Sequence, residues 1–241
     1  MIPTKTETLL SKMKHLKAHY LLIALIFLSI NFTNGQDTDT GNWFIYFGNQ
    51  AINKKWNWHN EIQYRNYNFA GDTQQILLRT GIGYNLTENN NNILLGYGFI
   101  NSHNYIPGTD DKTENNEHRI YQQFITRQNF GRFYLQHRYR VEERFLKDDF
   151  QMRFRYFLAL NIPLTKPKME DKAFYFSAYN EIFLNTESPT FDRDRLYGAL
   201  GYVINKNFRV ETGFMRQIQE KTGRNQFQIA IFNNIPFNSS K

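Results

Sequence analysis

Arginines and glutamates that recur two positions apart are the residues best suited to chemistry in this chain of 241 residues. Within 132–145 and 151–162 they alternate with apolar residues. Successive side chains of a β-strand point to opposite faces, so charges two apart share one face. Crowded guanidinium groups need acids or bound anions to neutralise them. The charges predicted to share one inward face are Glu61, Arg65, Arg79, Arg138, Arg140, Glu142, Arg144, Arg153, Arg155, Glu181, Arg209 and Glu211.

Two kinds of chemistry fit this inward row of charges. Guanidinium forks bind anions, so the row is compatible with an anion-preferring channel, transporter or ligand pocket. Arginine–glutamate pairs also fill a narrow lumen without any reaction. We favour the salt-bridged lumen and keep the anion channel as the alternative.

Catalytic patterns are absent from the sequence. It contains no H-E-x-x-H, no G-x-S-x-G and no phosphate loop, and Gly81-Ile-Gly83 is a lone G-x-G inside a predicted strand, where small residues relieve crowding. Ser102 has a histidine neighbour, His103, but adjacent strand residues face opposite sides. Ser177 has none. We therefore predict no catalytic residue, and a lipid-modifying hydrolase of the outer membrane is only a second alternative.

Metal and cofactor chemistry is equally weak. The chain has no cysteine, which excludes disulfides, thiolate metal sites and a lipid anchor on cysteine. The segment 106–117 carries four acids between two histidines, where a divalent cation could bind, but such a segment is more often a solvated loop. We predict no metal and no cofactor. These residues are His103, Asp110, Asp111, Glu114, Glu117 and His118.

The elements that position the charges are β-strands, because the hydrophobic period from residue 42 onward is two. In 118–128, Arg119, Tyr121, Gln123 and Arg127 are expected to point inward. The segments match the roughly ten residues of a tilted membrane strand. The candidates are 42–50, 56–67, 74–86, 93–105, 118–128, 132–145, 151–162, 173–185, 194–204, 208–219 and 226–235.

The pattern predicts an all-β fold, an antiparallel up-and-down transmembrane β-barrel. Eleven segments are found, but single-chain bacterial barrels have even strand numbers, so ten or twelve strands are predicted. Short turns near 51–54, 87–92, 129–131 and 205–207 are expected on the periplasmic side, since outer loops are longer. The longer segments 106–117 and 186–193 are expected outside.

Composition agrees with a membrane barrel. Aromatic residues make up 17% of the chain although its mean hydropathy is −0.62. A barrel with one lipid-facing and one polar face combines these properties. The alternative is a soluble β-sandwich or lipocalin-like barrel, but charges would then occupy the buried face. The aromatic-rich apolar face resembles the aromatic belts found at membrane interfaces.

The N-terminus predicts export. Lys12, Lys14 and Lys17 precede an apolar run over 20–30 and a small, polar region ending at Gly35. We predict a cleaved signal peptide over 1–35 and a barrel domain over 36–241. The run is too short for a spanning helix, which argues against an uncleaved anchor. The net charge of +7 includes lysines of this segment, and the rest is too small to imply nucleic acid.

Four sequence stretches resemble the bacterial family catalogued as domain of unknown function 2490. They are Asn116–Phe124, Gln136–Phe145, Tyr179–Asn185 and Asp194–Gly198. The resemblance covers 42–235 and implies an exported outer-membrane β-barrel without an assigned reaction. The expected partners of such a barrel are membrane lipid and, during insertion, the barrel-assembly machinery. The expected location is the outer membrane of a Gram-negative cell.

Overall fold

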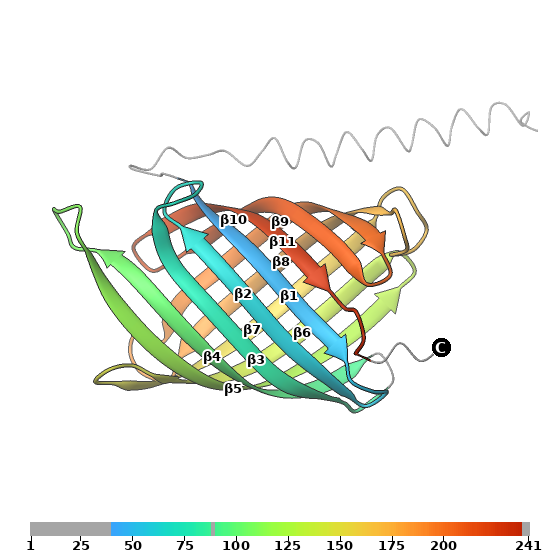
Figure 1. Ribbon diagram of the computed structural model, residues 1–241, viewed down its shortest axis with the longest axis horizontal. Helices are drawn as coiled ribbons and strands as arrows, with labels where there is room; N and C mark the ends of the chain where they lie inside the picture. The colour runs from blue at the N-terminus through green and yellow to red at the C-terminus, as the bar shows by residue number, and fades with distance from the viewer. Residues whose placement is uncertain (1–39, 88–89, 238–241) are drawn as a thin grey trace, which may run out of the picture. The chain divides into compact units, whose positions relative to one another are not determined.

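The computed structural model describes residues 40–87 and 90–237, and the expected signal peptide lies outside them. The described residues form a closed barrel of eleven strands (Figure 1). None of their segments is a helix long and apolar enough to cross a membrane. The strands are β1 Gly41–Ala51, β2 Trp56–Asn66, β3 Thr73–Asn85, β4 Asn91–Tyr105, β5 Lys112–Phe130, β6 Phe133–Phe145, β7 Phe150–Pro163, β8 Phe174–Asn185, β9 Phe191–Asn205, β10 Phe208–Ile218 and β11 Gly223–Asn233.

Consecutive strands pair in antiparallel ladders around the barrel, and one parallel ladder closes it. β1 pairs with β11, with Gly41 opposite Gln226 and Gly48 opposite Asn233. The prediction of ten or twelve antiparallel strands is therefore wrong. An odd number of strands makes the first and last run in the same direction, so their closing ladder must be parallel. The eleven alternating segments of the sequence correspond to the eleven strands. The expectation that single-chain bacterial barrels have an even number of strands led to the wrong prediction.

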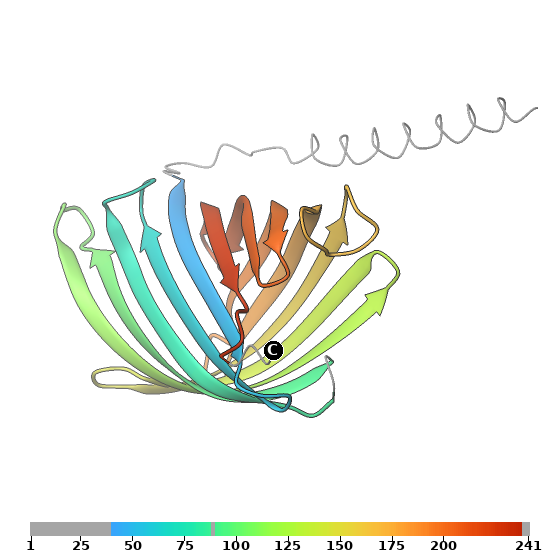
Figure 2. The same ribbon diagram turned by 45° about the vertical axis from the view of Figure 1, so that its right-hand side comes forward.

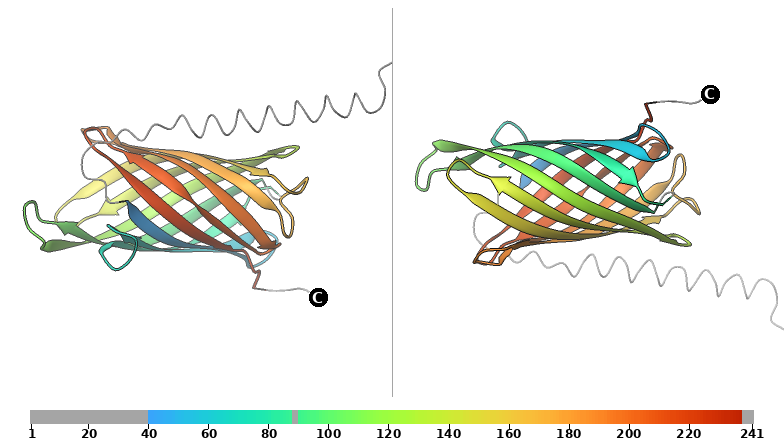
Figure 3. Two further views of the ribbon diagram at one scale, coloured as in Figure 1. Left: turned by 90° about the horizontal axis from the view of Figure 1, so that it is seen from above. Right: turned by 90° about the horizontal axis from the view of Figure 1, so that it is seen from below.

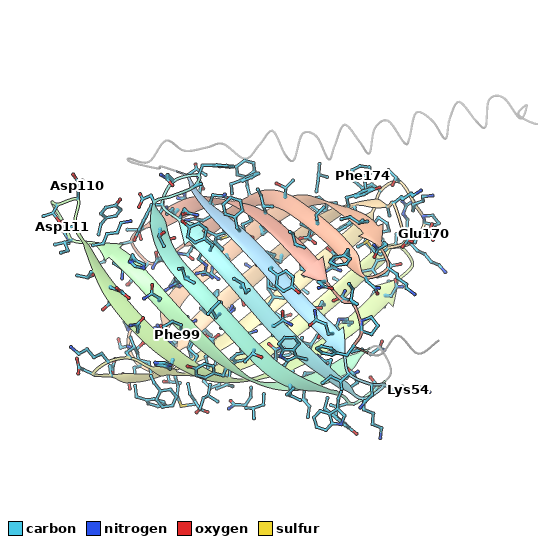
Figure 4. The ribbon with its side chains drawn as sticks, viewed as in Figure 1. Lys54, Phe99, Asp110, Asp111, Glu170 and Phe174 are labelled. Atoms are coloured by element: carbon cyan, nitrogen blue, oxygen red, sulfur yellow. The ribbon has the colours of Figure 1, made fainter. Side chains whose placement is uncertain are left out.

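The connections fall into two sets, one at each end of the barrel. The loop end holds 67–72, 106–111, 146–149, 186–190 and 219–222, and the turn end holds 52–55, 86–87, 90, 131–132, 164–173 and 206–207. The two predicted long segments lie at the loop end and the predicted short turns at the turn end. The exception is 164–173, a longer loop at the turn end that contains Glu170 (Figure 4).

The hairpin of β4 and β5 extends well beyond its neighbours at the loop end (Figure 2). Asp110 and Asp111 lie at its tip (Figure 4). Lys112 already pairs with Tyr105, so the loop is only 106–111. The predicted loop 106–117 is too long at its C-terminal side, because Glu114 and Glu117 already lie on β5.

The strands cross the barrel obliquely on both of its long faces (Figure 3), as closure of a twisted sheet requires. Their two faces follow the predicted phase. Leu77 and Arg79 of β3 are buried, whereas Ile76 and Leu78 are exposed. In β5 the inward residues include Arg119, Tyr121 and Gln123, as the sequence predicted.

Inward glycines make room for large side chains. A Cβ on Gly81 would lie 2.7 Å from Leu94 Cδ2, and one on Gly83 would overlap Asn57. The predicted role of this Gly-Ile-Gly stretch in relieving crowding is confirmed. The ring of Tyr121 likewise lies where a Cβ on Gly96 would be.

Candidate functional site in the barrel lumen

The predicted charges all lie on strands with their side chains on the inward face. Three of them, Arg138, Arg144 and Arg209, are half-buried. The others are buried: Glu61, Arg65, Arg79, Arg140, Glu142, Arg153, Arg155, Glu181 and Glu211. Because water is largely excluded from these groups, the free-energy cost of burying each charge depends on whether it has an oppositely charged partner.

Glu142 of β6 is the centre of the charged network and is 0% exposed. Its Oε1 accepts a hydrogen bond from Arg155 Nη1 at 2.5 Å, and its Oε2 accepts one from Arg153 Nη2 at 2.6 Å. Arg140 Nη1 lies 3.4 Å from Oε1. Two further guanidinium nitrogens lie 3.9 Å away, on Arg79 and Arg119. One carboxylate thus holds together arginines from four strands.

Glu181 of β8 is a second centre. Its Oε1 lies 2.6 Å from Arg155 Nη2 and 2.7 Å from Arg138 Nη2, and its Oε2 lies 3.8 Å from Arg195 Nη1. Arg155 therefore bridges the two central glutamates. We call the connected residues the ion-pair cluster: Glu61, Arg79, Glu117, Arg119, Arg138, Arg140, Glu142, Arg144, Arg153, Arg155, Glu181, Asp192 and Arg195.

The rest of the cluster occupies the loop-end half of the lumen. Glu117 Oε1 lies 2.6 Å from both Arg119 Nε and Arg144 Nε. Asp192 Oδ2 lies 2.7 Å from Arg153 Nη1. These carboxylates neutralise arginines that would otherwise repel one another.

Four members of the cluster are missing from the predicted set. Arg119 was placed inward, but its partner Glu117 was assigned to the loop. Alternation along 194–204 puts Arg195 on the face of Tyr197, a signal that could have found it. Asp192 lies beside a register irregularity between β8 and β9, so strict alternation gives no signal for it.

A cavity of about 530 Å³ occupies the rest of the lumen, from the cluster to the turn end. Its lining reaches Ala51 and Asn85, the last residues of β1 and β3. Eight arginines and three glutamates line it, so it is strongly cationic. Arg144 and Arg153, near the loop end of β6 and β7, do not line it, whereas Trp43 and Arg65, near the loop end of β1 and β2, do.

The alternative hydrolase and metal sites of the sequence do not form in the described part of the chain. Ser102 Oγ accepts a hydrogen bond from Gln75, and the His103 ring bonds Asn101 instead. No three carboxylate or histidine groups among residues 40–87 and 90–237 could hold a metal ion. Glu117, the acid nearest the barrel in the predicted loop, points into the lumen. The charged lumen is the candidate site that these residues offer.

The sequence comparison identifies the family. A family model described as a protein of unknown function (DUF2490) matches residues 40–228, from the start of β1 into β11. The chain belongs to the DUF2490 family. The resemblance seen in the sequence is thereby confirmed, and the DUF2490 match includes the whole ion-pair cluster. No curated protein and no solved structure matches the chain. A function for this DUF2490 barrel must therefore be argued from its geometry.

Proposed function

We propose that this DUF2490 protein is a non-enzymatic outer-membrane barrel whose lumen is closed by the ion-pair cluster and does not conduct ions. One observation carries the proposal. Glu142 is fully buried in the lumen, and arginines from β3, β5, β6 and β7 converge on it.

The outward face supports a membrane location. Leu95, Leu200 and Ile62 are 61%, 59% and 51% exposed on different strands. Soluble proteins rarely expose contiguous apolar surface beyond a few hundred Å². An apolar hollow of about 1030 Å³ also runs along the outward face, where Ile82, Leu95 and Phe124 contribute to its lining. Acyl chains of the bilayer would cover this surface.

Aromatic pairs near both barrel ends support the same location. Phe145 and Phe150 lie 5.2 Å apart at the loop end, and Trp56 and Tyr84 lie 4.9 Å apart at the turn end. Aromatic rings favour the headgroup level of a membrane. Short turns are typical of the periplasmic side. The proposed orientation therefore places the turn end in the periplasm and the loop end outside, after export directed by a cleaved signal peptide.

The ion-pair cluster supports a closed lumen because its members come from seven of the eleven strands. They extend from β2 and β3 through β5, β6 and β7 to β8 and β9. An ion passing through would have to separate buried arginine–glutamate pairs, and stranding one partner of such a pair is costly.

Planar-bilayer recording tests the proposal. The purified barrel should insert without producing a steady current, while a general porin in the same bilayer serves as the positive control. Heat-modifiable gel mobility shows that the added protein is folded. A steady, anion-biased current would overturn the closed lumen. It would favour the second candidate function, an anion channel, which the eight arginines of the cavity support.

A further inference from the structure

We propose that the cationic cavity is a binding site for an organic anion with an apolar, aromatic-sized body. The inference rests on the proposed function in one respect, namely that the cluster closes the cavity at its inner end. The volume of about 530 Å³ lies within the roughly 300–1,000 Å³ typical of small-molecule sites. A bare inorganic anion would fill only a small part of it.

The cavity has two unlike walls. Strands β7 to β11 and β1 are adjacent in the barrel and contribute all the Trp, Tyr and Phe residues of the lining, together with three arginines, Arg155, Arg195 and Arg209. The aromatic residues include Trp43, Phe47, Phe157, Tyr197 and Phe232. Strands β2 to β6 form the opposite arc. Their lining is mostly polar and includes five arginines: Arg65, Arg79, Arg127, Arg138 and Arg140. A ligand that fills this space has to bring an apolar body to the aromatic residues and negative charge to the arginines beside them.

The cavity has cationic charge left over. Glu61 and Glu181 are already paired with Arg79 and Arg155. The third glutamate, Glu211, accepts a hydrogen bond from the Tyr175 hydroxyl at 2.8 Å. Among the described residues, three lining arginines have no carboxylate within 4.0 Å: Arg65, Arg127 and Arg209.

Three lining arginines also present unused donors. Among the described residues, the Nε atoms of Arg79, Arg138 and Arg209 are buried and have no hydrogen-bond partner. Arg209 stacks on Phe232 with its Cζ 4.1 Å from the ring centroid, and Arg138 stacks on Phe157 at 4.4 Å. Stacking fixes the plane of a guanidinium and leaves its edge free to donate. A buried donor without a partner is costly, so a ligand oxygen that accepts from it gains affinity.

These features favour a carboxylate or sulfonate on an aromatic or aliphatic body over free phosphate. The apolar residues of the lining provide the contact for the body, and the guanidinium edges beside Phe157 and Phe232 bind the head. The lining reaches the turn end of the barrel, so the ligand enters from that side.

Isothermal titration calorimetry with 2-naphthoate tests the inference on the full barrel in detergent. We expect saturable binding at one site. The neutral analogue 2-naphthylmethanol and inorganic phosphate should each bind about tenfold or more weaker, because each lacks one half of the recognition. The naphthyl alcohol also corrects for partition into the micelle.

The variants locate the site. Arg209→Met removes an arginine that has no carboxylate within 4.0 Å, and it should weaken naphthoate binding about tenfold or more. Arg138→Met should do the same, and Glu181 retains Arg155 as a partner. Arg216→Met is the matched control, since Arg216 is on the same strand but bonds Asn225 outside the cavity. Heat-modifiable mobility confirms folding of each variant.

Three results would overturn the inference: no saturable naphthoate binding, unchanged affinity in Arg209→Met and Arg138→Met, or phosphate or the alcohol binding as tightly as naphthoate. The proposed function fails separately. A current through the barrel with naphthoate binding intact would overturn the closed lumen alone, whereas a silent barrel without binding would overturn the ligand site alone.

Discussion

Glu142 is the residue on which most of the lumen charge depends. Its carboxylate faces five arginines, and it is shielded from water. Burying an ion pair is often neutral for stability, but removing one partner leaves the other charge buried and unpaired. The importance of Glu142 therefore lies in the repulsion that its absence would create.

Glu142→Ala should lower the free energy of unfolding by about 3–5 kcal/mol. Glu142→Gln should lower it less, because the single amide oxygen still accepts from one of the two arginines, Arg153 or Arg155. The measurement is urea unfolding in phospholipid vesicles, followed by tryptophan fluorescence. Glu143→Ala is the matched control. Glu143 is the outward neighbour of Glu142, and among the described residues its side chain bonds Gln122. We expect its loss to change the free energy of unfolding by roughly 0.5 kcal/mol. Equal effects of the two alanine variants would contradict the role of the cluster.

The side chain of Asp72 joins the 67–72 loop to the β4–β5 hairpin at the loop end of the barrel. It accepts hydrogen bonds from Lys112 and from the Tyr105 hydroxyl, the latter at 2.9 Å. Partial burial raises the pKa of Asp72, but these two bonds outweigh it and hold the pKa below its ordinary value. The contact therefore contributes stability above the ordinary carboxyl pKa of roughly 3.9, and this is lost as the pH falls through the lowered value.

Carboxyl-carbon NMR can follow this titration. Asp72 should titrate below the ordinary range in the native chain, and Lys112→Met should raise its pKa toward the ordinary value. Lys206→Met, at the opposite end of the barrel, should leave it unchanged. An ordinary pKa for Asp72 in the native chain would show that the loop and the hairpin are not held together.

At the scale of the strand, the outward face of β9 gives a test of depth in the membrane. Leu200 is near the middle of the strand and 59% exposed, and Ile204 is near its end and 47% exposed. Leu200→Arg should cost about 2–4 kcal/mol in lipid vesicles, and Ile204→Arg about 0–1 kcal/mol, because the penalty falls toward the interface. Equal and small penalties at both positions would contradict a lipid-facing surface.

Strand alternation explains how much of the barrel could be predicted. The two faces of 74–86 and 151–162, and even the ambiguous phase of 118–128, follow from a period of two because a polar lumen and an apolar exterior select opposite residue types. Glu117 was missed because acids near a hairpin tip look the same whether they are solvated or paired inside. The convergence on Glu142 joins residues from four strands, and neither period nor spacing carries that information.

At the scale of the whole molecule, the odd strand number puts the beginning of β1 and the end of β11 at opposite ends of the barrel. In the proposed orientation the loop end is outside. Because the chain has no cysteine, single-cysteine variants need no background substitutions. Asp110→Cys should react with an impermeant maleimide in intact cells, and Lys206→Cys only after the outer membrane is permeabilised. The reverse pattern would invert the orientation.

The ladder between β1 and β11 also sets an order of events during folding. It joins the two segments of the barrel that are farthest apart in sequence, so it forms only when every intervening hairpin is in place. Until then, both strands have unpaired edges, which are templates for pairing with other chains. Synthesis that stops before β11 leaves these edges permanently open. The last strand to be made is thus the one that separates a closed barrel from a sheet with two open, aggregation-prone edges.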